Sequence, residues 1–62
     1  MIMNAKLTTL LEEVRRTATP EQIEELEYYI RAYDGNFDEV ILSMRYNSLL
    51  SDIANCYLEY GL

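Results

Sequence analysis

Apolar residues recur at spacings of three and four along almost the whole chain, and this period limits the fold more than any other feature. One series runs from Met3 to Val14 and a second from Ile23 to Tyr33. Such spacing places apolar side chains on one face of a helix. The 62 residues include only one proline and two glycines. The sequence therefore predicts a single all-α domain over residues 1–62. It would be a small bundle of three to four short helices, with homodimerisation as a second way to complete it.

The starts of the first two helices can be predicted from capping residues. Asn4 is expected to cap the first helix, because its side chain can accept a hydrogen bond from a free backbone N–H; a start two residues earlier is the alternative. Thr19 is the expected N-cap of the second helix, with Pro20 at the first helical position. Gln22, three residues after Thr19, completes a capping box.

The segment Asp34–Glu39 predicts a turn between two helices. Gly35 suits the left-handed C′ position that ends a helix. Asn36 is then expected to cap a third helix, with Glu39 as its capping-box partner. The segment also begins like a calcium loop, but its sixth and twelfth positions are Glu39 and Arg45 instead of Gly and Glu. No metal site is expected.

The second helix, this turn and the third helix resemble the corresponding part of ubiquitin-associated domains. The matching residue types are Ile30, Ala32, Gly35, Asn36, Val40 and Met44. The resemblance covers about a quarter of the chain. It implies a helical adaptor that binds ubiquitin. In that family a Met-Gly-Phe or Met-Gly-Tyr loop between the first two helices contacts ubiquitin, and the corresponding loop here is Thr17-Ala18-Thr19.

The apolar face changes direction after Met44. The apolar residues that follow form a stripe on roughly the opposite side of a continued helix: Tyr46, Leu49, Leu50, Ile53, Tyr57 and Tyr60. A straight helix cannot bury both faces against one neighbour. Either the helix breaks near Tyr46–Ser48 and Asn47 or Ser48 caps a fourth helix that folds back, or one long helix offers the stripe to another molecule.

Composition excludes several classes of function. The chain has no histidine and a single cysteine, Cys56, so a Cys/His zinc site and an internal disulfide are both excluded. No apolar run approaches the roughly 20 residues that span a bilayer. No glycine-rich phosphate loop is present, and adjacent carboxylates on a helix do not converge. We expect a cytoplasmic, non-enzymatic protein that has no cofactor, does not bind membranes and buries Cys56 as a structural thiol.

The net charge of −6 is concentrated in the middle of the chain. Residues 20–39 carry seven acids and one arginine, which equals the net charge of the whole chain. Such a charge disfavours direct contact with nucleic acid and favours a basic partner. Opposite the apolar face of the second helix lie Glu21, Glu24, Glu25 and Tyr28. An exposed aromatic among acids is typical of a protein interface.

The leading functional hypothesis is therefore a regulator or inhibitor that docks this acidic helix on a basic surface of a target protein. Small acidic proteins of phages and mobile elements that block nucleic-acid enzymes provide the analogy. The alternative is a structural module that self-associates, as a homo-oligomer, through the stripe from Tyr46 to Tyr60. The resemblance to ubiquitin-associated domains gives a third hypothesis, an adaptor.

Overall fold

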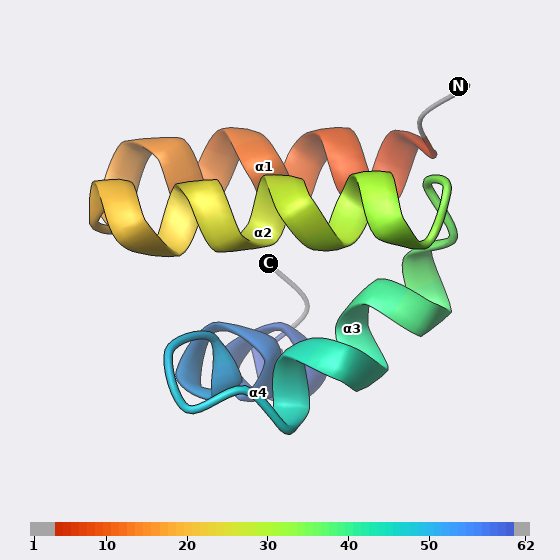
Figure 1. Ribbon diagram of the computed structural model, residues 1–62. Helices are drawn as coiled ribbons and strands as arrows, with labels where there is room; N and C mark the ends of the chain where they lie inside the picture. The colour runs from red at the N-terminus through yellow and green to blue at the C-terminus, as the bar shows by residue number, and fades with distance from the viewer. Residues whose placement is uncertain (1–3, 61–62) are drawn as a thin grey trace.

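The computed structural model describes residues 4–60, and of Tyr60 only the backbone (Figure 1). Within these residues the chain forms four helices and no strand. The helices are α1 (Ala5–Thr17), α2 (Pro20–Ala32), α3 (Phe37–Arg45) and α4 (Ser51–Tyr60). The predicted all-α fold is confirmed, and α4 follows the three helices that the resemblance to ubiquitin-associated domains implies.

The helices α1 and α2 run side by side in opposite directions, joined by a two-residue connection (Figure 1). Asn4 caps α1 by accepting a hydrogen bond from the N–H of Lys6 at 2.7 Å. The Thr19 hydroxyl accepts from the N–H of Gln22 at 3.2 Å, and Gln22 Oε1 accepts from the N–H of Thr19 at 3.0 Å. With Pro20 in the first turn, all the predicted start signals of α1 and α2 are confirmed.

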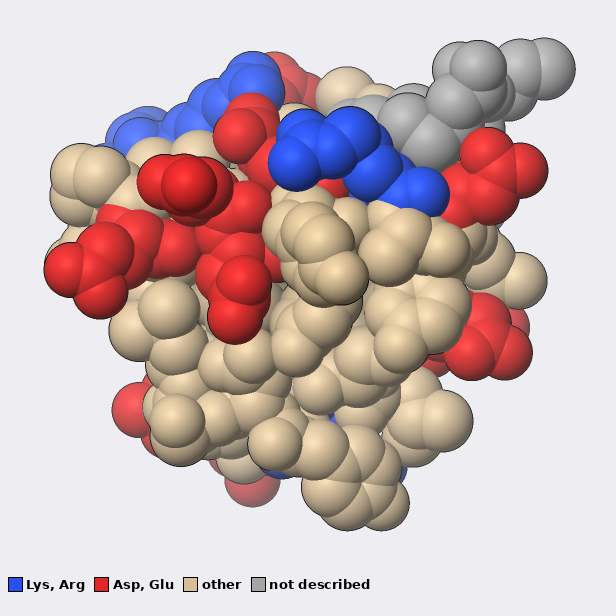
Figure 2. Space-filling model, in the orientation of Figure 1, with Lys and Arg blue, Asp and Glu red and all other residues tan. Residues whose placement is uncertain are grey.

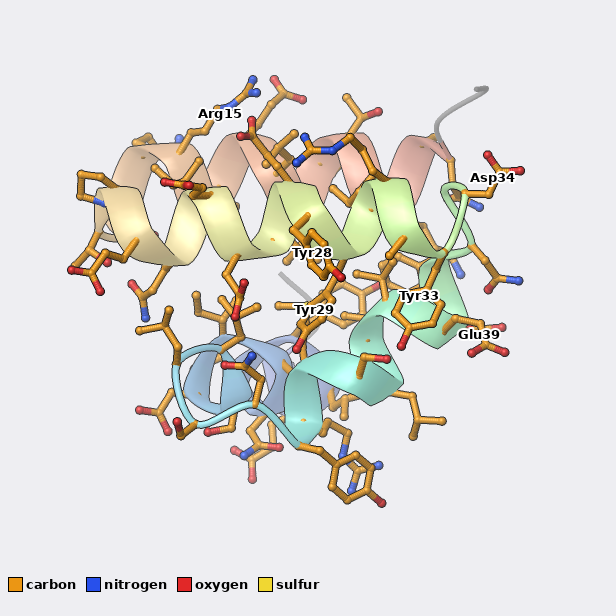
Figure 3. All side chains as sticks on the ribbon, in the orientation of Figure 1. Arg15, Tyr28, Tyr29, Tyr33, Asp34 and Glu39 are labelled. Atoms are coloured by element: carbon orange, nitrogen blue, oxygen red, sulfur yellow. The ribbon has the colours of Figure 1, made fainter. Side chains whose placement is uncertain are left out.

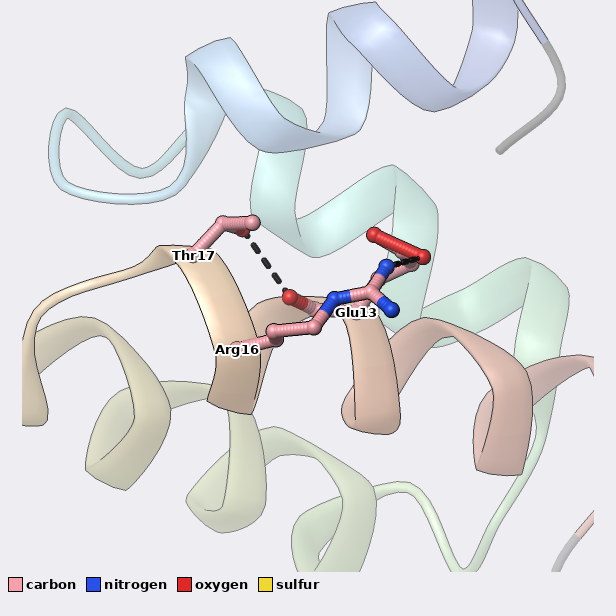
Figure 4. Close-up of polar contacts among 3 residues, drawn as sticks. All are labelled: Glu13, Arg16 and Thr17. Carbon is pink, nitrogen blue, oxygen red and sulfur yellow. Dashed lines mark hydrogen bonds and ion pairs between the residues drawn. The ribbon is translucent and has the colours of Figure 1, made fainter.

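Polar contacts close the last turn of α1 and join it to α2. The Arg16 guanidinium contacts the Glu13 carboxylate, and the Thr17 hydroxyl donates to the Glu13 carbonyl at 2.9 Å (Figure 4). The neighbouring Arg15 reaches across to α2, where its Nη2 lies 2.7 Å from Glu27 Oε2. Both arginines lie where a positive charge compensates the negative end of the helix dipole.

The turn that ends α2 contains two residues with positive φ, Asp34 at 53° and Gly35 at 75°. The N–H of Gly35 donates to the Ile30 carbonyl at 2.9 Å, and the N–H of Asp34 donates to the Arg31 carbonyl at 3.3 Å. This pair of hydrogen bonds defines a Schellman motif. The left-handed C′ residue is therefore Asp34, and the prediction of Gly35 at C′ is wrong by one position. Gly35 takes the next position, where it is buried.

Asn36 caps α3 as predicted, but without its expected partner. Its Oδ1 accepts from the N–H of Glu39 at 3.1 Å. Its own N–H donates to the Tyr33 carbonyl at 3.0 Å. The N–H that Glu39 would have accepted from is thus already used by the Schellman turn, and the Glu39 side chain is exposed. The predicted capping box is half formed.

The chain breaks between α3 and α4, and Asn47 is the residue that caps the new helix. Asn47 Oδ1 accepts from the N–H groups of Leu49 at 2.8 Å and Leu50 at 3.3 Å. The Asn47 carbonyl accepts from the N–H of Ser51 at 2.8 Å. Of the two alternatives left open by the sequence, the break near Tyr46–Ser48 is the one observed.

One hydrophobic core receives side chains from all four helices and from the loop before α4. Its buried members are Leu7, Leu10, Leu11, Val14, Leu26, Ile30, Val40, Ile41, Met44, Leu50 and Ala54. Phe37 of α3 contacts both α1 and α4. Its ring packs edge-on against that of Tyr57, with the ring centroids 5.1 Å apart, and Lys6 Nζ lies 5.6 Å from its ring centroid. The Cα radius of gyration is 10.2 Å, close to the roughly 10.6 Å of a compact chain of this length.

Consecutive helices pack on one another, and all four contribute side chains to the core. In the view of Figure 1, α2 and α3 lie toward the viewer and α1 and α4 lie behind them. The face formed by α2 and α3 carries the predicted acidic residues.

Candidate protein-binding surface

The four residues predicted to bind a partner lie on the outer side of α2, but they are not equally accessible. Glu21 and Glu24 are exposed, Glu25 is half-buried, and Tyr28 is 55% exposed. The three carboxylates line a shallow depression of about 280 Å³, and Leu49 of the α3–α4 loop forms the rest of its lining. The fold thus brings an apolar residue of the predicted C-terminal stripe next to the predicted acidic face.

Within the described residues, no cationic side chain pairs with these carboxylates. Two ion pairs form within residues 4–60, each made by an arginine of α1, and neither includes Glu21, Glu24 or Glu25. Figure 2 shows the result as a group of acidic side chains over the first half of α2, at the left of the view. An uncompensated charge of one sign attracts an oppositely charged partner and raises its rate of encounter.

Glu25 also has a structural partner, which the sequence analysis missed. Asn47 Nδ2 donates to Glu25 Oε2 at 3.1 Å and lies 2.8 Å from the hydroxyl oxygen of Tyr29. One turn earlier on α2, Gln22 Nε2 donates to the carbonyl of Leu49 at 3.0 Å. These contacts clamp the α3–α4 loop to α2 and hold the Glu25 carboxylate in place. No local pattern in the sequence signals bonds between residues this far apart.

Tyr28 belongs to a group of three neighbouring tyrosines, which we call the tyrosine strip: Tyr28 and Tyr29 on α2, and Tyr33 at its C-cap. The ring centroids of Tyr28 and Tyr29 are 5.8 Å apart, and those of Tyr29 and Tyr33 are 6.1 Å apart. Figure 3 shows all three rings on the face formed by α2 and α3. Tyr33, placed by its spacing in the apolar series, is 37% exposed. The sequence analysis did not identify this strip, although the position of Tyr33 one helical turn after Tyr29 could have signalled it.

The described residues of the predicted C-terminal stripe differ in exposure. Leu50 is fully buried, Ile53 and Tyr57 are half-buried against the core, and Leu49 is half-buried in the loop. Only Tyr46, at 84%, is largely exposed, and the side chain of Tyr60 lies outside the described residues. The break at Asn47 turns Leu50 into the core, while self-association through the stripe stays a prediction.

Cys56 is exposed, and the expectation that it is buried is wrong. Ala54, two residues earlier, takes the fully buried position on this part of α4. The thiol lies at a groove of about 210 Å³ between α1 and α4. The groove is lined by Glu13, Val14, Thr17, Asp52, Ile53 and Cys56.

Two further properties concern the described part of the chain. None of its helices combines the length and the apolar character needed to cross a bilayer. Its acids and its cysteine do not gather in any group of three that could hold a metal ion. Comparison of the chain with protein-family models, with curated proteins and with solved structures finds no match.

Proposed function

We propose that this chain is a small non-enzymatic protein that binds a basic surface of a target protein through the first half of α2, and so regulates or inhibits that target. One observation carries the proposal. Three carboxylates that form no ion pair within residues 4–60 line a depression together with Leu49, and Tyr28 on the same helix is 55% exposed. The single exposed thiol suits a reducing compartment, so we place the interaction in the cytoplasm.

The parts of this surface would contribute in different ways. Glu21 and Glu24 are exposed and would act mainly on the rate of encounter, because rim charges steer association and are screened by salt. Tyr28 brings a large rigid ring with a polar tip, the kind of side chain that dominates interface energies. Glu25 is held by Asn47, so less side-chain entropy is lost when it accepts a bond from the partner.

The charge of the surface narrows the kind of target. Basic surfaces on proteins are common where nucleic-acid phosphates bind, since phosphate contacts dominate such affinity. A helix with closely spaced carboxylates can occupy the same surface. We therefore propose that the target is a nucleic-acid enzyme and that binding of this chain excludes the nucleic acid.

Affinity capture from source cells tests the proposal when it compares matched variants. The surface variant is Glu21→Gln/Glu24→Gln with Tyr28→Ala, and it leaves Glu25 in place because Glu25 holds the α3–α4 loop. We expect a protein that is retained by the wild type and lost with this variant. A short DNA duplex added as competitor should release the same protein.

The control variant is Glu12→Gln/Glu59→Gln, which removes two exposed carboxylates from α1 and α4. It changes the net charge by the same amount as the two substitutions on α2. We expect it to retain the target. Equal loss of the target with both variants would show that the interaction depends only on net charge. Retention of the target by both variants would contradict the proposal.

A further inference from the structure

We infer that the tyrosine strip receives an arginine-bearing segment of the partner, which lies along α2 with its guanidinium groups over the exposed rings. This inference rests on the proposed function, because it names what the basic surface of the target presents. The carboxylates of the first half of α2 account for only one end of such an interface. The strip accounts for its middle.

The strip offers ring faces and not only apolar area. Tyr28 and Tyr33 are 55% and 37% exposed, while Tyr29 between them is half-buried and lies 2.8 Å from Asn47 Nδ2 through its hydroxyl oxygen. The middle ring is therefore fixed by the fold, and it contacts both of its neighbours. Restrained rings lose little freedom when a partner packs on them.

Acidic groups lie at both ends of the strip. The carboxylates of the first half of α2 lie at one end, and Asp34 and Glu39 lie beyond Tyr33 at the other (Figure 3). Figure 2 shows uncharged surface between two groups of acidic side chains, with a basic side chain along its upper edge. The 13 residues of α2 extend about 20 Å, which about six residues of an extended segment would span.

The one arginine of α2 indicates on which side the segment lies. Arg31 is one helical turn beyond Glu27, and Glu27 faces α1 because it pairs with Arg15. Arg31 would therefore repel a cationic segment from the α1 side of the strip. On the other side, toward α3, no cationic side chain of α2 opposes the segment.

Arginine fits this surface better than lysine for two reasons. A planar guanidinium stacks on an aromatic ring while its N–H groups stay free to bind carboxylates in a bidentate manner. An ammonium ion is a compact and strongly hydrated charge that gains less from an exposed ring. Each ring–cation contact at an exposed site is worth about two- to fivefold in affinity.

The test uses two capped eight-residue peptides in which alanine alternates with arginine or with lysine. Binding to the full chain is measured at about 150 mM salt by amide chemical shifts, where charges more than a Debye length apart are screened. We expect the arginine peptide to bind at least about threefold more tightly. We also expect it to shift the amide signals of Tyr28 and Tyr33.

The decisive variant is Tyr28→Leu/Tyr33→Leu, which keeps apolar bulk and removes two rings. It should weaken the arginine peptide by about five- to thirtyfold. Tyr46→Leu is the matched control, because Tyr46 is the most exposed tyrosine for which exposure is described and lies outside the strip. The control should not change the affinity.

Three outcomes would overturn the inference: equal affinity for the two peptides, no effect of the strip variant, or an equal effect of Tyr46→Leu. Comparison with Glu21→Gln/Glu24→Gln separates this failure from failure of the proposed function. If those substitutions weaken both peptides while the strip variant does not, the acidic docking surface stands and the role of the strip fails. If neither variant weakens either peptide, both proposals fail.

Discussion

The side chain of Asn47 forms four hydrogen bonds that join the start of α4 to the outer face of α2. Its oxygen accepts from two backbone N–H groups, and its nitrogen contacts Glu25 and Tyr29. The Asn side-chain amide carries an acceptor oxygen and a donor nitrogen that can bind different partners at the same time. Asn47 therefore fixes both the fold of the loop and the position of Glu25 in the candidate surface.

Replacement of Asn47 by Ala or by Asp should separate these two roles. Asn47→Ala removes the cap and leaves Glu25 and Tyr29 without their donor, and we expect a loss of about 1–3 kcal/mol in the free energy of unfolding. Asn47→Asp keeps the cap but places a carboxylate beside Glu25. Urea denaturation followed by circular dichroism measures both losses.

A second substitution tests the contact with Glu25 directly. In the Asn47→Asp background, Glu25→Gln should restore about 1 kcal/mol, because the amide can donate to the new carboxylate. In the wild-type background the same Glu25→Gln substitution should be neutral or destabilising. An equal effect in both backgrounds would show that residues 25 and 47 do not interact.

Substitutions at the two residues with positive φ at the end of α2 should change the stability in opposite directions. Gly35→Ala adds a Cβ to a buried residue at φ 75°, and we expect it to cost about 1–2 kcal/mol or more. Asp34→Gly relieves a non-glycine residue at φ 53° and should stabilise the chain by about 0.5–1 kcal/mol. Chemical denaturation of the two variants checks both signs.

At the scale of the elements, helix starts could be predicted from the sequence because a cap depends on residues within one turn of one another. Asn4, Thr19 with Gln22, and Asn36 all illustrate this. From the sequence, a break before α4 and a continuous helix both stayed open, since no Gly or Pro enforces a break. The contacts of Asn47 with α2 decide it, and they depend on how the helices are placed in the whole fold.

The position of the break can be tested with two large apolar residues of the predicted stripe. Leu50 is fully buried and Tyr46 is 84% exposed. Leu50→Ala should therefore lower the free energy of unfolding by about 2–5 kcal/mol, while Tyr46→Ala should change it by less than about 0.5 kcal/mol. Similar losses at both positions would indicate a continuous helix with its stripe buried against a second molecule.

At the scale of the molecule, the sequence left open whether a fold-back of the chain or a second copy covers the core. In the structure, later residues of the same chain cover it. The buried residues of α1, α2 and α3 are covered by Leu50 and Ala54 from the last third of the chain. The candidate surface was predictable only in part, for a related reason. Glu21, Glu24 and Tyr28 follow from the helical period of α2 alone, whereas Leu49 reaches them only through tertiary packing.

Thermal unfolding at different protein concentrations tests whether the core is complete. Because a single chain covers its own core, we expect the same melting temperature at about 5 and 500 µM. If a second copy completed the core, mass action would raise the stability by about 2.7 kcal/mol per hundredfold increase above the dissociation constant. A clear rise in melting temperature would thus favour the homodimer.

The exposure of Cys56 gives the molecule a natural attachment point. It is the only cysteine in the chain, and it lies at the groove between α1 and α4, behind the face formed by α2 and α3 in Figure 1. A maleimide reagent would therefore place one dye or one surface linkage on each molecule without a substitution. Molecules immobilised through that sulfur would present the tyrosine strip and the carboxylates of α2 to the solution.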